Sequence, residues 1–198
     1  MMSSYKEVVY CFKIVILGSG GVGKTSLFNR YCFNSFKMDT EMTIGLNFHS
    51  TYLNIKFENN EQYDSNNKYI VNSIFDFGGQ ERFKSLIPRL LNGTDGALIV
   101  FDLVSYSSFQ QIDYWYNLLK SKIERKIPIL LVGSKSDLLE STSEMEIVQE
   151  DSIQEIIKKF DLDGFYRTSS LKNYNVLNAF KELNKIMLSY NNFNAVIL

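Results

Sequence analysis

Short apolar runs alternate along the chain with longer segments in which apolar residues recur every three or four positions. Continuous apolar runs at residues 13–17, 97–101 and 129–132 predict strands that are buried on both faces of a sheet. Residues 165–168 predict one further strand near the end of the chain. This pattern indicates a sheet with covered faces.

The segments between these runs have the periodicity of amphipathic helices. We expect helices over residues 24–34, from about residue 107 to residue 123, over 153–160 and over 176–190. Asp151 or Ser152 is the expected N-cap of the third helix, because short polar side chains can accept from free N–H groups there.

A hairpin is predicted between the first helix and the second buried run. Residues 46–57 alternate between apolar side chains, such as Phe48 and Tyr52, and polar ones, as a half-exposed strand does. Residues 58–68 are rich in Asn and charge, which predicts an extended exposed turn, and residues 69–75 return as a second strand.

Strands that alternate with helices favour a mostly parallel sheet with helices on both faces. We therefore expect a single α/β domain over residues 1–198, with six strands and one antiparallel edge strand. Ligands of such sheets bind beyond the carboxyl ends of the strands, and each polar motif described below follows a strand.

One glycine-rich stretch directly follows the first strand and begins the first helix. It fits the pattern G-x-x-x-x-G-K-[ST] of the phosphate-binding loop, with the residues Gly18, Ser19, Gly20, Gly21, Val22, Gly23, Lys24 and Thr25. Glycines allow successive N–H groups to surround phosphate oxygens, and the helix N-terminus adds partial positive charge. The Lys24 ammonium can neutralise the outer phosphates, and the Thr25 hydroxyl can bind Mg²⁺. The sequence therefore predicts binding of a nucleoside diphosphate or triphosphate.

Composition restricts the remaining classes of protein. The 198 residues are 45% apolar and 22% charged, as in one soluble domain, and the net charge of −1 gives no general attraction to nucleic acid. Cys11 and Cys32 are too few for a disulfide framework, so we expect free, buried thiols in a reducing compartment. The apolar run at residues 8–17 is too short to span a bilayer and lacks a cleavage pattern, so a cytoplasmic location is expected.

Three stretches in order carry a resemblance to a known family. GSGGVGKTSL at residues 18–27, TIGLNF at 43–48 and DFGGQERF at 76–83 resemble the Ras-like small GTPases, most closely the Rab branch. The resemblance extends from about residue 13 to residue 190. It implies a P-loop NTPase fold and a GTPase that converts GTP and water to GDP and phosphate.

The resemblance also implies roles at the phosphates. Ser26 lies with the phosphate-binding loop, Thr25, Thr43 and Asp76 would hold Mg²⁺, and the Gly79 N–H would contact the γ-phosphate. Gln80 would orient the attacking water, so the residues implied in catalysis are Lys24, Thr43 and Gln80. Phosphoryl transfer of this kind depends on positioning and charge neutralisation.

A second set of residues is implied at the base. The expected guanine contacts come from Phe36, Ser134, Lys135, Asp137, Ser169, Ser170 and Leu171. The Asp137 carboxylate would accept from guanine N1–H and N2–H₂, a pair of donors that adenine lacks. Ser134 stands where the family usually has Asn, and Leu171 where it usually has Lys, so we expect weaker or faster-exchanging guanine binding.

These features predict a switch that binds GTP and hydrolyses it slowly, in trafficking or signalling. The alternative is a guanine-nucleotide-binding module that does not hydrolyse GTP. A small-molecule kinase is disfavoured because no arginine-rich lid is evident. No arginine is evident at the γ-phosphate, so we expect GTPase-activating proteins as partners, together with effectors and exchange factors. We also expect the loops at 36–43 and 80–86 to respond to the γ-phosphate.

The last residues differ from the family pattern. No cysteine is present in residues 194–198, so no prenyl anchor is visible, and three apolar residues are too few to anchor the chain. Either the protein is not prenylated or the natural chain extends further; if this end is native, we expect recruitment to membranes to occur through partners.

Overall fold

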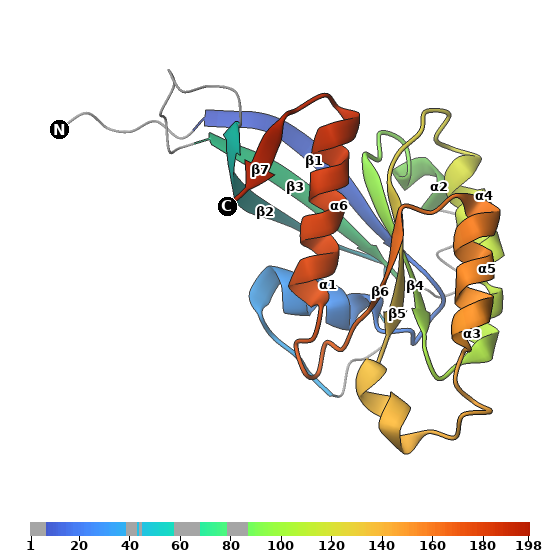
Figure 1. The fold of residues 1–198 in the computed structure, drawn as a ribbon. Coiled ribbons are helices and arrows are strands. Elements are labelled where there is room, and N and C mark those ends of the chain that lie inside the picture. Colours follow the sequence, from blue (N-terminus) through green and yellow to red (C-terminus); the bar gives the residue numbers. More distant parts are fainter. Residues whose placement is uncertain (1–6, 39–42, 44, 58–67, 79–86) are drawn as a thin grey trace.

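The protein folds around one sheet of seven strands, in the order β6-β5-β4-β1-β3-β2-β7 (Figure 1). This computed structural model describes residues 7–38, 43, 45–57, 68–78 and 87–198. The strands are β1 (Glu7–Leu17), β2 (Leu46–Phe57), β3 (Lys68–Phe77), β4 (Gly96–Asp102), β5 (Ile129–Ser134), β6 (Gly164–Arg167) and β7 (Ala195–Ile197). β1, β3, β4, β5 and β6 pair in parallel, and β2 pairs antiparallel with both β3 and β7.

Helices cover both faces of the sheet, as predicted (Figure 1). The helical elements are α1 (Lys24–Phe33), α2 (Ile87–Leu90), α3 (Tyr106–Gln110), α4 (Ile112–Lys120), η2 (Ser136–Ser141), α5 (Glu150–Phe160) and α6 (Val176–Tyr190). Apolar side chains of α1 and α6 pack on one face, and those of α3, α4 and α5 pack on the other. In the part of the chain that the structure describes, no helix is long and apolar enough to cross a membrane.

The last four residues of β1 show how the two layers arise from alternation. Ile14 and Ile16 lie in the core below α1 and α6, whereas Val15 and Leu17 lie in the core below α3 and α4. All residues of β4 and β5 are buried, because both faces of these central strands are covered. The apolar runs therefore predicted the central strands correctly.

Several predicted boundaries differ from the observed ones. β1 begins at Glu7, six residues before the predicted start, and β3 runs from Lys68 to Phe77. The helix predicted from residue 107 to 123 is two helices, because the chain turns at Gln111. The N-cap of α5 is Gln149, so the prediction of Asp151 or Ser152 is wrong. Residues 58–67 of the predicted turn lie outside the described residues.

The seventh strand, β7, was not predicted. Ile197 pairs with Ile55 and Ala195 pairs with Phe57, and the Leu198 N–H donates to Asn54 O over 3.0 Å. These terminal residues therefore extend the edge of the sheet. The Phe193 ring supports the connection, with its centroid 5.5 Å from that of Tyr10.

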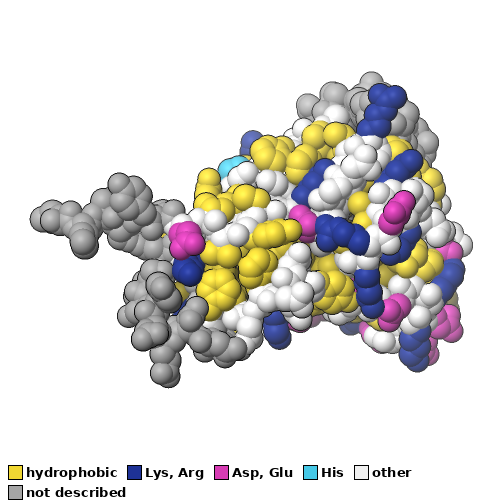
Figure 2. Space-filling model, turned by 90° about the horizontal axis from the view of Figure 1, so that it is seen from above, with side chains coloured by type: hydrophobic (Ala, Val, Ile, Leu, Met, Phe, Trp, Pro, Cys, Tyr) yellow, Lys and Arg dark blue, Asp and Glu magenta, His cyan; other side chains and the backbone are white. Residues whose placement is uncertain are grey.

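Hydrophobic side chains also lie on the surface, as Figure 2 shows for one side of the molecule. The alternation in β2 is real, but Phe48 and Tyr52 belong to its exposed face and are 55% and 65% exposed. Leu53 and Ile55 supply the buried face instead. Cys11 is exposed as well, which corrects the expectation that both free thiols are buried.

Candidate nucleotide-binding site

The carboxyl ends of β1, β3, β5 and β6 lead to residues around one cavity of about 430 Å³. Its lining residues are Gly20, Gly21, Gly23, Lys24, Thr25, Ser26, Phe36, Lys37, Met38, Thr43, Phe77, Ser134, Lys135, Asp137, Leu138, Ser170 and Leu171. The structure thus brings together the predicted phosphate-binding residues at one end and the predicted base-binding residues at the other. Gly79 and Gln80 lie outside the described residues, so their predicted roles stay predictions.

Two glycines allow the loop between β1 and α1 to adopt its shape. Gly18 has φ +147°, and a Cβ there would lie 2.2 Å from Val100 O, so no side chain fits. Gly23 is the N-cap of α1 with φ +92°, a conformation that other residues rarely adopt. The loop therefore directs α1 so that its N-terminus begins in the wall of the cavity.

Lys24 is the most buried cation of the cavity wall, with an exposed fraction of only 5%. Its Nζ donates to Ser19 O over 2.7 Å, which folds the side chain back over the loop. Burial lowers the pKa of Lys24 to about 8, although the nearby Asp76 carboxylate favours the charged form. A phosphate placed here would favour the ammonium form by supplying the negative charge that the site lacks.

Three oxygen-bearing side chains meet beside Lys24. The Thr25 hydroxyl lies 2.7 Å from Asp76 Oδ2 and 2.5 Å from the Thr43 hydroxyl, and Asn47 Nδ2 donates to Asp76 Oδ2 over 3.0 Å. Asp76 is fully buried, and its Oδ1 has no hydrogen-bond partner among the described residues. Burial raises the pKa of Asp76, while its contacts with Thr25 and Asn47 and the charge of Lys24 lower it.

This arrangement fits a magnesium ion. Mg²⁺ prefers oxygen ligands and is held by one or two carboxylates together with substrate phosphates. The unpartnered Oδ1 of Asp76 and the two adjacent hydroxyls are oxygen donors of that kind. Among the described residues, no group of three His, Cys, Asp and Glu side chains could hold a metal, so a complete protein cage is not formed there.

Asp76 and Thr43 reach this position by different routes. Asp76 lies inside β3, not beyond its end as the sequence suggested, and pairs in register with Ile16 and Asn47. The segment that contains Thr43 passes close to Gly78, where a Cβ would lie 2.4 Å from Thr43 O. Glycine at position 78 therefore permits this approach of Thr43 to Thr25.

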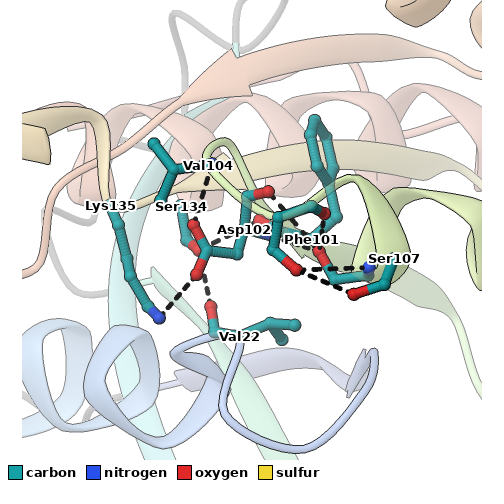
Figure 3. Close-up of polar contacts among 9 residues, drawn as sticks. Val22, Phe101, Asp102, Val104, Ser107, Ser134 and Lys135 are labelled. Atoms are coloured by element: carbon teal, nitrogen blue, oxygen red, sulfur yellow. Dashed lines mark hydrogen bonds and ion pairs between the residues drawn. The ribbon is translucent and has the colours of Figure 1, made fainter. Parts of the chain in front are cut away.

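Ser134 holds the end of β5 to the phosphate-binding loop (Figure 3). Its buried hydroxyl lies 2.5 Å from Val22 O and 2.9 Å from Phe101 O, with a single proton to share between these two acceptors. The hydroxyl thus points at the loop backbone. The sequence placed Ser134 among the base contacts, whereas the structure shows a side chain that joins two walls of the cavity.

Lys135 lies in the wall with an ion pair behind it (Figure 3). Its Nζ is 2.6 Å from Asp102 Oδ2, and Asp102 Oδ1 accepts from the Val104 N–H over 3.0 Å. Lys135 has φ 58°, a left-handed conformation that is uncommon outside glycine and asparagine. The chain reverses there and presents Asp137 at the start of η2.

Asp137 and Ser169 connect two loops at the base end of the cavity. Ser169 Oγ lies 2.5 Å from Asp137 Oδ1, and it also accepts from the Lys172 N–H over 3.0 Å. Ser169 and Tyr174 exchange two backbone hydrogen bonds, which close the loop that contains Ser170 and Leu171. Both of these residues line the cavity, as predicted.

Some residues differ from the predicted set. Gly18, Ser19, Val22, Asp76 and Ser169 do not line the cavity but support its walls. Four lining residues were not predicted from the sequence, namely Lys37, Met38, Phe77 and Leu138. Each lies within two positions of a predicted residue, so proximity to Phe36, Asp76 and Asp137 could have indicated that these residues line the cavity. No local motif could have identified Asn47 as a partner of Asp76, because this contact depends on strand register.

A strand, a glycine loop with a buried lysine, and a helix at the carboxyl edge of a mostly parallel sheet define the class of P-loop nucleotide-binding proteins. A model of the Ras family matches residues 13–189, and the chain belongs to that family. Its fold is the Ras-like P-loop GTPase fold, with seven strands and not the predicted six.

Curated relatives agree with this assignment. The chain is 34% identical to Ras-related protein RABA1c of Arabidopsis thaliana, over 92% of this chain and 79% of the relative. It is 36% identical to Ras-related protein Rab-11C of Dictyostelium discoideum, over 92% and 75%. It is 33% identical to Ras-related protein YPT3 of Nicotiana plumbaginifolia, over 91% and 78%. These similarities bear out the resemblance to Rab-type small GTPases.

Proposed function

We propose that the protein is a guanine-nucleotide switch that binds GTP, hydrolyses it slowly to GDP and acts in intracellular trafficking. The observation that supports this most is the 2.5 Å contact between the hydroxyls of Thr43 and Thr25. Thr43 belongs to the segment that leads from α1 to β2, and Thr25 belongs to α1 itself. A loop residue that meets the phosphate site can respond to the terminal phosphate.

At the phosphates, this chain neutralises charge and fixes position. Lys24 and the N–H groups of the loop at Gly20 and Gly23 would surround the β- and γ-phosphates. Thr25, Thr43 and Asp76 would hold Mg²⁺, which supplies further neutralisation of the developing charge when bound. Phosphoryl transfer to water depends on charge neutralisation and positioning of this kind.

Hydrolysis would depend on Gln80, which would orient the attacking water. No arginine lines the described part of the cavity, and Lys24 is the lysine that lies over the phosphate-binding loop. We expect intrinsic turnover on the order of 10⁻⁴–10⁻³ s⁻¹, the value of Ras itself, and acceleration by a partner that inserts an arginine. Effectors and exchange factors complete the expected set of partners, in a cytoplasmic protein that partners recruit to membranes.

At the base, Asp137 would accept from guanine N1–H and N2–H₂, and the Ser170 N–H would donate to guanine O6. Lys135 would lie along one face of the ring and Phe36 near its edge, since both line the cavity. Adenine offers no matching pair of donors to Asp137, and a carboxylate left without partners costs about 1–3 kcal/mol or more. Guanine is therefore the expected base.

The first test is the identity of the bound nucleotide. Protein purified without added nucleotide is denatured, and the released compounds are identified by mass spectrometry. We expect GDP or GTP at close to one equivalent. Adenine nucleotides at that level, or none, with no binding of added GDP, would refute guanine binding.

The second test separates the switch from a module that binds without hydrolysis. Single-turnover release of phosphate from GTP is measured with Mg²⁺ for the wild type and for Gln80→Leu. The wild type should release phosphate slowly, and Gln80→Leu should release it at least roughly tenfold more slowly because the water is no longer oriented. A wild type that binds GTP but releases no phosphate would favour the non-hydrolysing module.

A further inference from the structure

Arg30 links two segments at the base end of the cavity without lining the cavity itself. It lies in the last turn of α1, and its Nε donates to Ser170 O over 2.8 Å. Its Nη1 donates to Asn34 over 3.1 Å at the backbone oxygen and 3.2 Å at Oδ1. One guanidinium thus joins α1 to a residue 140 positions further along the chain.

The contact with Ser170 fixes a peptide group of the loop that would hold the guanine. Only the Ser170 Cα separates this carbonyl from the Ser170 N–H, so holding the Ser170 C=O also restricts the position of that N–H. The same loop is closed on its other side by the backbone pair of Ser169 and Tyr174. The position of the Ser170–Leu171 peptide relative to α1 therefore depends on Arg30.

The contact with Asn34 acts on the opposite wall. Asn34 is the C-cap of α1 with φ 48°, and Phe36, two residues later, lines the cavity. The planar guanidinium directs Nε and Nη1 to different acceptors, which a lysine ammonium cannot reproduce in one fixed geometry. Arg30 therefore joins the Phe36 side and the Ser170 side of the base end.

We propose that Arg30 is a positioning residue that slows release of the guanine nucleotide by holding the Ser170 loop against the guanine O6. This inference rests on the proposed function, because the O6 contact of the Ser170 N–H belongs to it. Arg30 acts through the backbone of Ser170 and does not contact the nucleotide. No other group of the described residues donates to Ser170 O in place of Arg30.

The test compares dissociation of two diphosphates from the wild type and from Arg30→Met. One is GDP, and the other is 2-aminopurine riboside 5′-diphosphate, which keeps the N2 amine but lacks both O6 and the N1–H. Release of each is followed by stopped-flow fluorescence with a methylanthraniloyl label. We expect Arg30→Met to release GDP roughly five- to tenfold faster, as for the loss of one typical hydrogen bond, and to release the O6-free analogue less than about twofold faster.

Further variants separate the two contacts. Arg30→Lys should release GDP as fast as Arg30→Met, because a lysine ammonium does not donate in the two fixed directions of Nε and Nη1. Asn34→Gly keeps the left-handed cap and the backbone oxygen, so it should have a smaller effect than Arg30→Met. Lys158→Met is the matched control, because it removes a cation from the exposed face of α5, and its release rates should equal those of the wild type.

Each outcome has one meaning. Equal acceleration of both diphosphates by Arg30→Met would overturn the proposal, because it would show a general loosening of the site. Release of GDP from Arg30→Met at the wild-type rate would also overturn it. A wild type that does not bind GDP, or that releases GDP and the O6-free analogue at the same rate, would refute the proposed guanine contacts before Arg30 is considered.

Discussion

At the scale of single residues, Ser134 changes the expectation that the sequence raised. Replacement of the usual Asn by Ser suggested a weaker hold on guanine, yet the hydroxyl lies within hydrogen-bond distance of both Val22 O and Phe101 O (Figure 3). A short side chain can reach both oxygens because the end of β5 lies next to the loop and to β4. Ser134 therefore joins two walls of the cavity that it also lines.

We predict that Ser134→Ala releases GDP about five- to tenfold faster than the wild type. The variant leaves the two buried backbone oxygens without the hydroxyl, which costs about 1–1.5 kcal/mol. Stopped-flow dissociation of labelled GDP measures the change, with Ser134→Thr as a control that keeps the hydroxyl. Release at the wild-type rate by Ser134→Ala would show that this hydrogen bond does not hold the loop.

The two cysteines should differ in reactivity. Burial, with a further contribution from the charge of Asp76, raises the pKa of Cys32 to about 12, whereas Cys11 is exposed. At pH 8, iodoacetamide should therefore modify Cys11 and leave Cys32 largely intact, since the thiolate is the reactive form. Peptide mapping by mass spectrometry checks this, and equal modification of both thiols would contradict it.

The raised pKa of Cys32 also makes the free energy of unfolding depend on pH. The folded-state pKa of Cys32 lies above its ordinary value of 9.0, so the unfolded chain loses this proton first as pH rises. The protonated thiol contributes fully to the free energy of unfolding below about pH 9, and this contribution is lost between pH 9 and 12. Cys32→Ala should reduce the dependence of the free energy of unfolding on pH in that window, as measured by urea denaturation.

At the scale of elements, β7 extends the sheet beyond the predicted edge. Three residues pair with β2, and Ile197 packs against the core below α1 and α6, whereas Val196 points away and is 41% exposed. An edge strand that is covered in this way no longer presents its free N–H and C=O groups along those residues. β7 therefore protects one end of β2.

We predict that Ile197→Ser lowers the free energy of unfolding by about 1–2 kcal/mol, because it removes a partly buried apolar side chain. Val196→Ser is the matched control in the same strand and should change the free energy by less than about 0.5 kcal/mol. Urea denaturation with saturating GDP and Mg²⁺ measures both. Equal effects of the two variants would show that β7 does not pack as described.

The elements that the sequence predicted best are those whose pattern is long and local. β2 and α6 were predicted to the residue, because a dozen or more positions repeat with period two or 3.6. β7 was missed because three residues carry no period and its partner lies about 140 positions away. The break at Gln111 was missed because the apolar spacing continues across it.

The residues of the site also divide into those that local motifs predicted and those whose contacts depend on the fold. Lys24, Thr25 and Asp137 were predicted from local motifs, and the structure places them around the cavity. The contacts of Asn47 with Asp76 and of Ser134 with Val22 depend on which strands are neighbours, and no local motif records that. Motifs thus predicted which residues take part, and the fold shows what holds them.

At the scale of the whole molecule, different segments hold the two ends of one cavity. Thr43 meets Thr25 at the phosphate end, and Arg30 joins Ser170 and Asn34 at the base end. A third phosphate would add charge beside the buried Lys24 and the half-buried Thr25 and Thr43. The protein should therefore report the presence of that phosphate through the segment that contains Thr43.

Hydrogen exchange tests this central claim most directly. Exchange at residues 36–43 and 80–86 is compared with bound GDP and with a non-hydrolysable GTP analogue, both with Mg²⁺, and α5 (Glu150–Phe160) serves as an internal reference. The account predicts slower exchange in both segments with the analogue and no difference in α5. Identical exchange in both segments with the two nucleotides would contradict the switch.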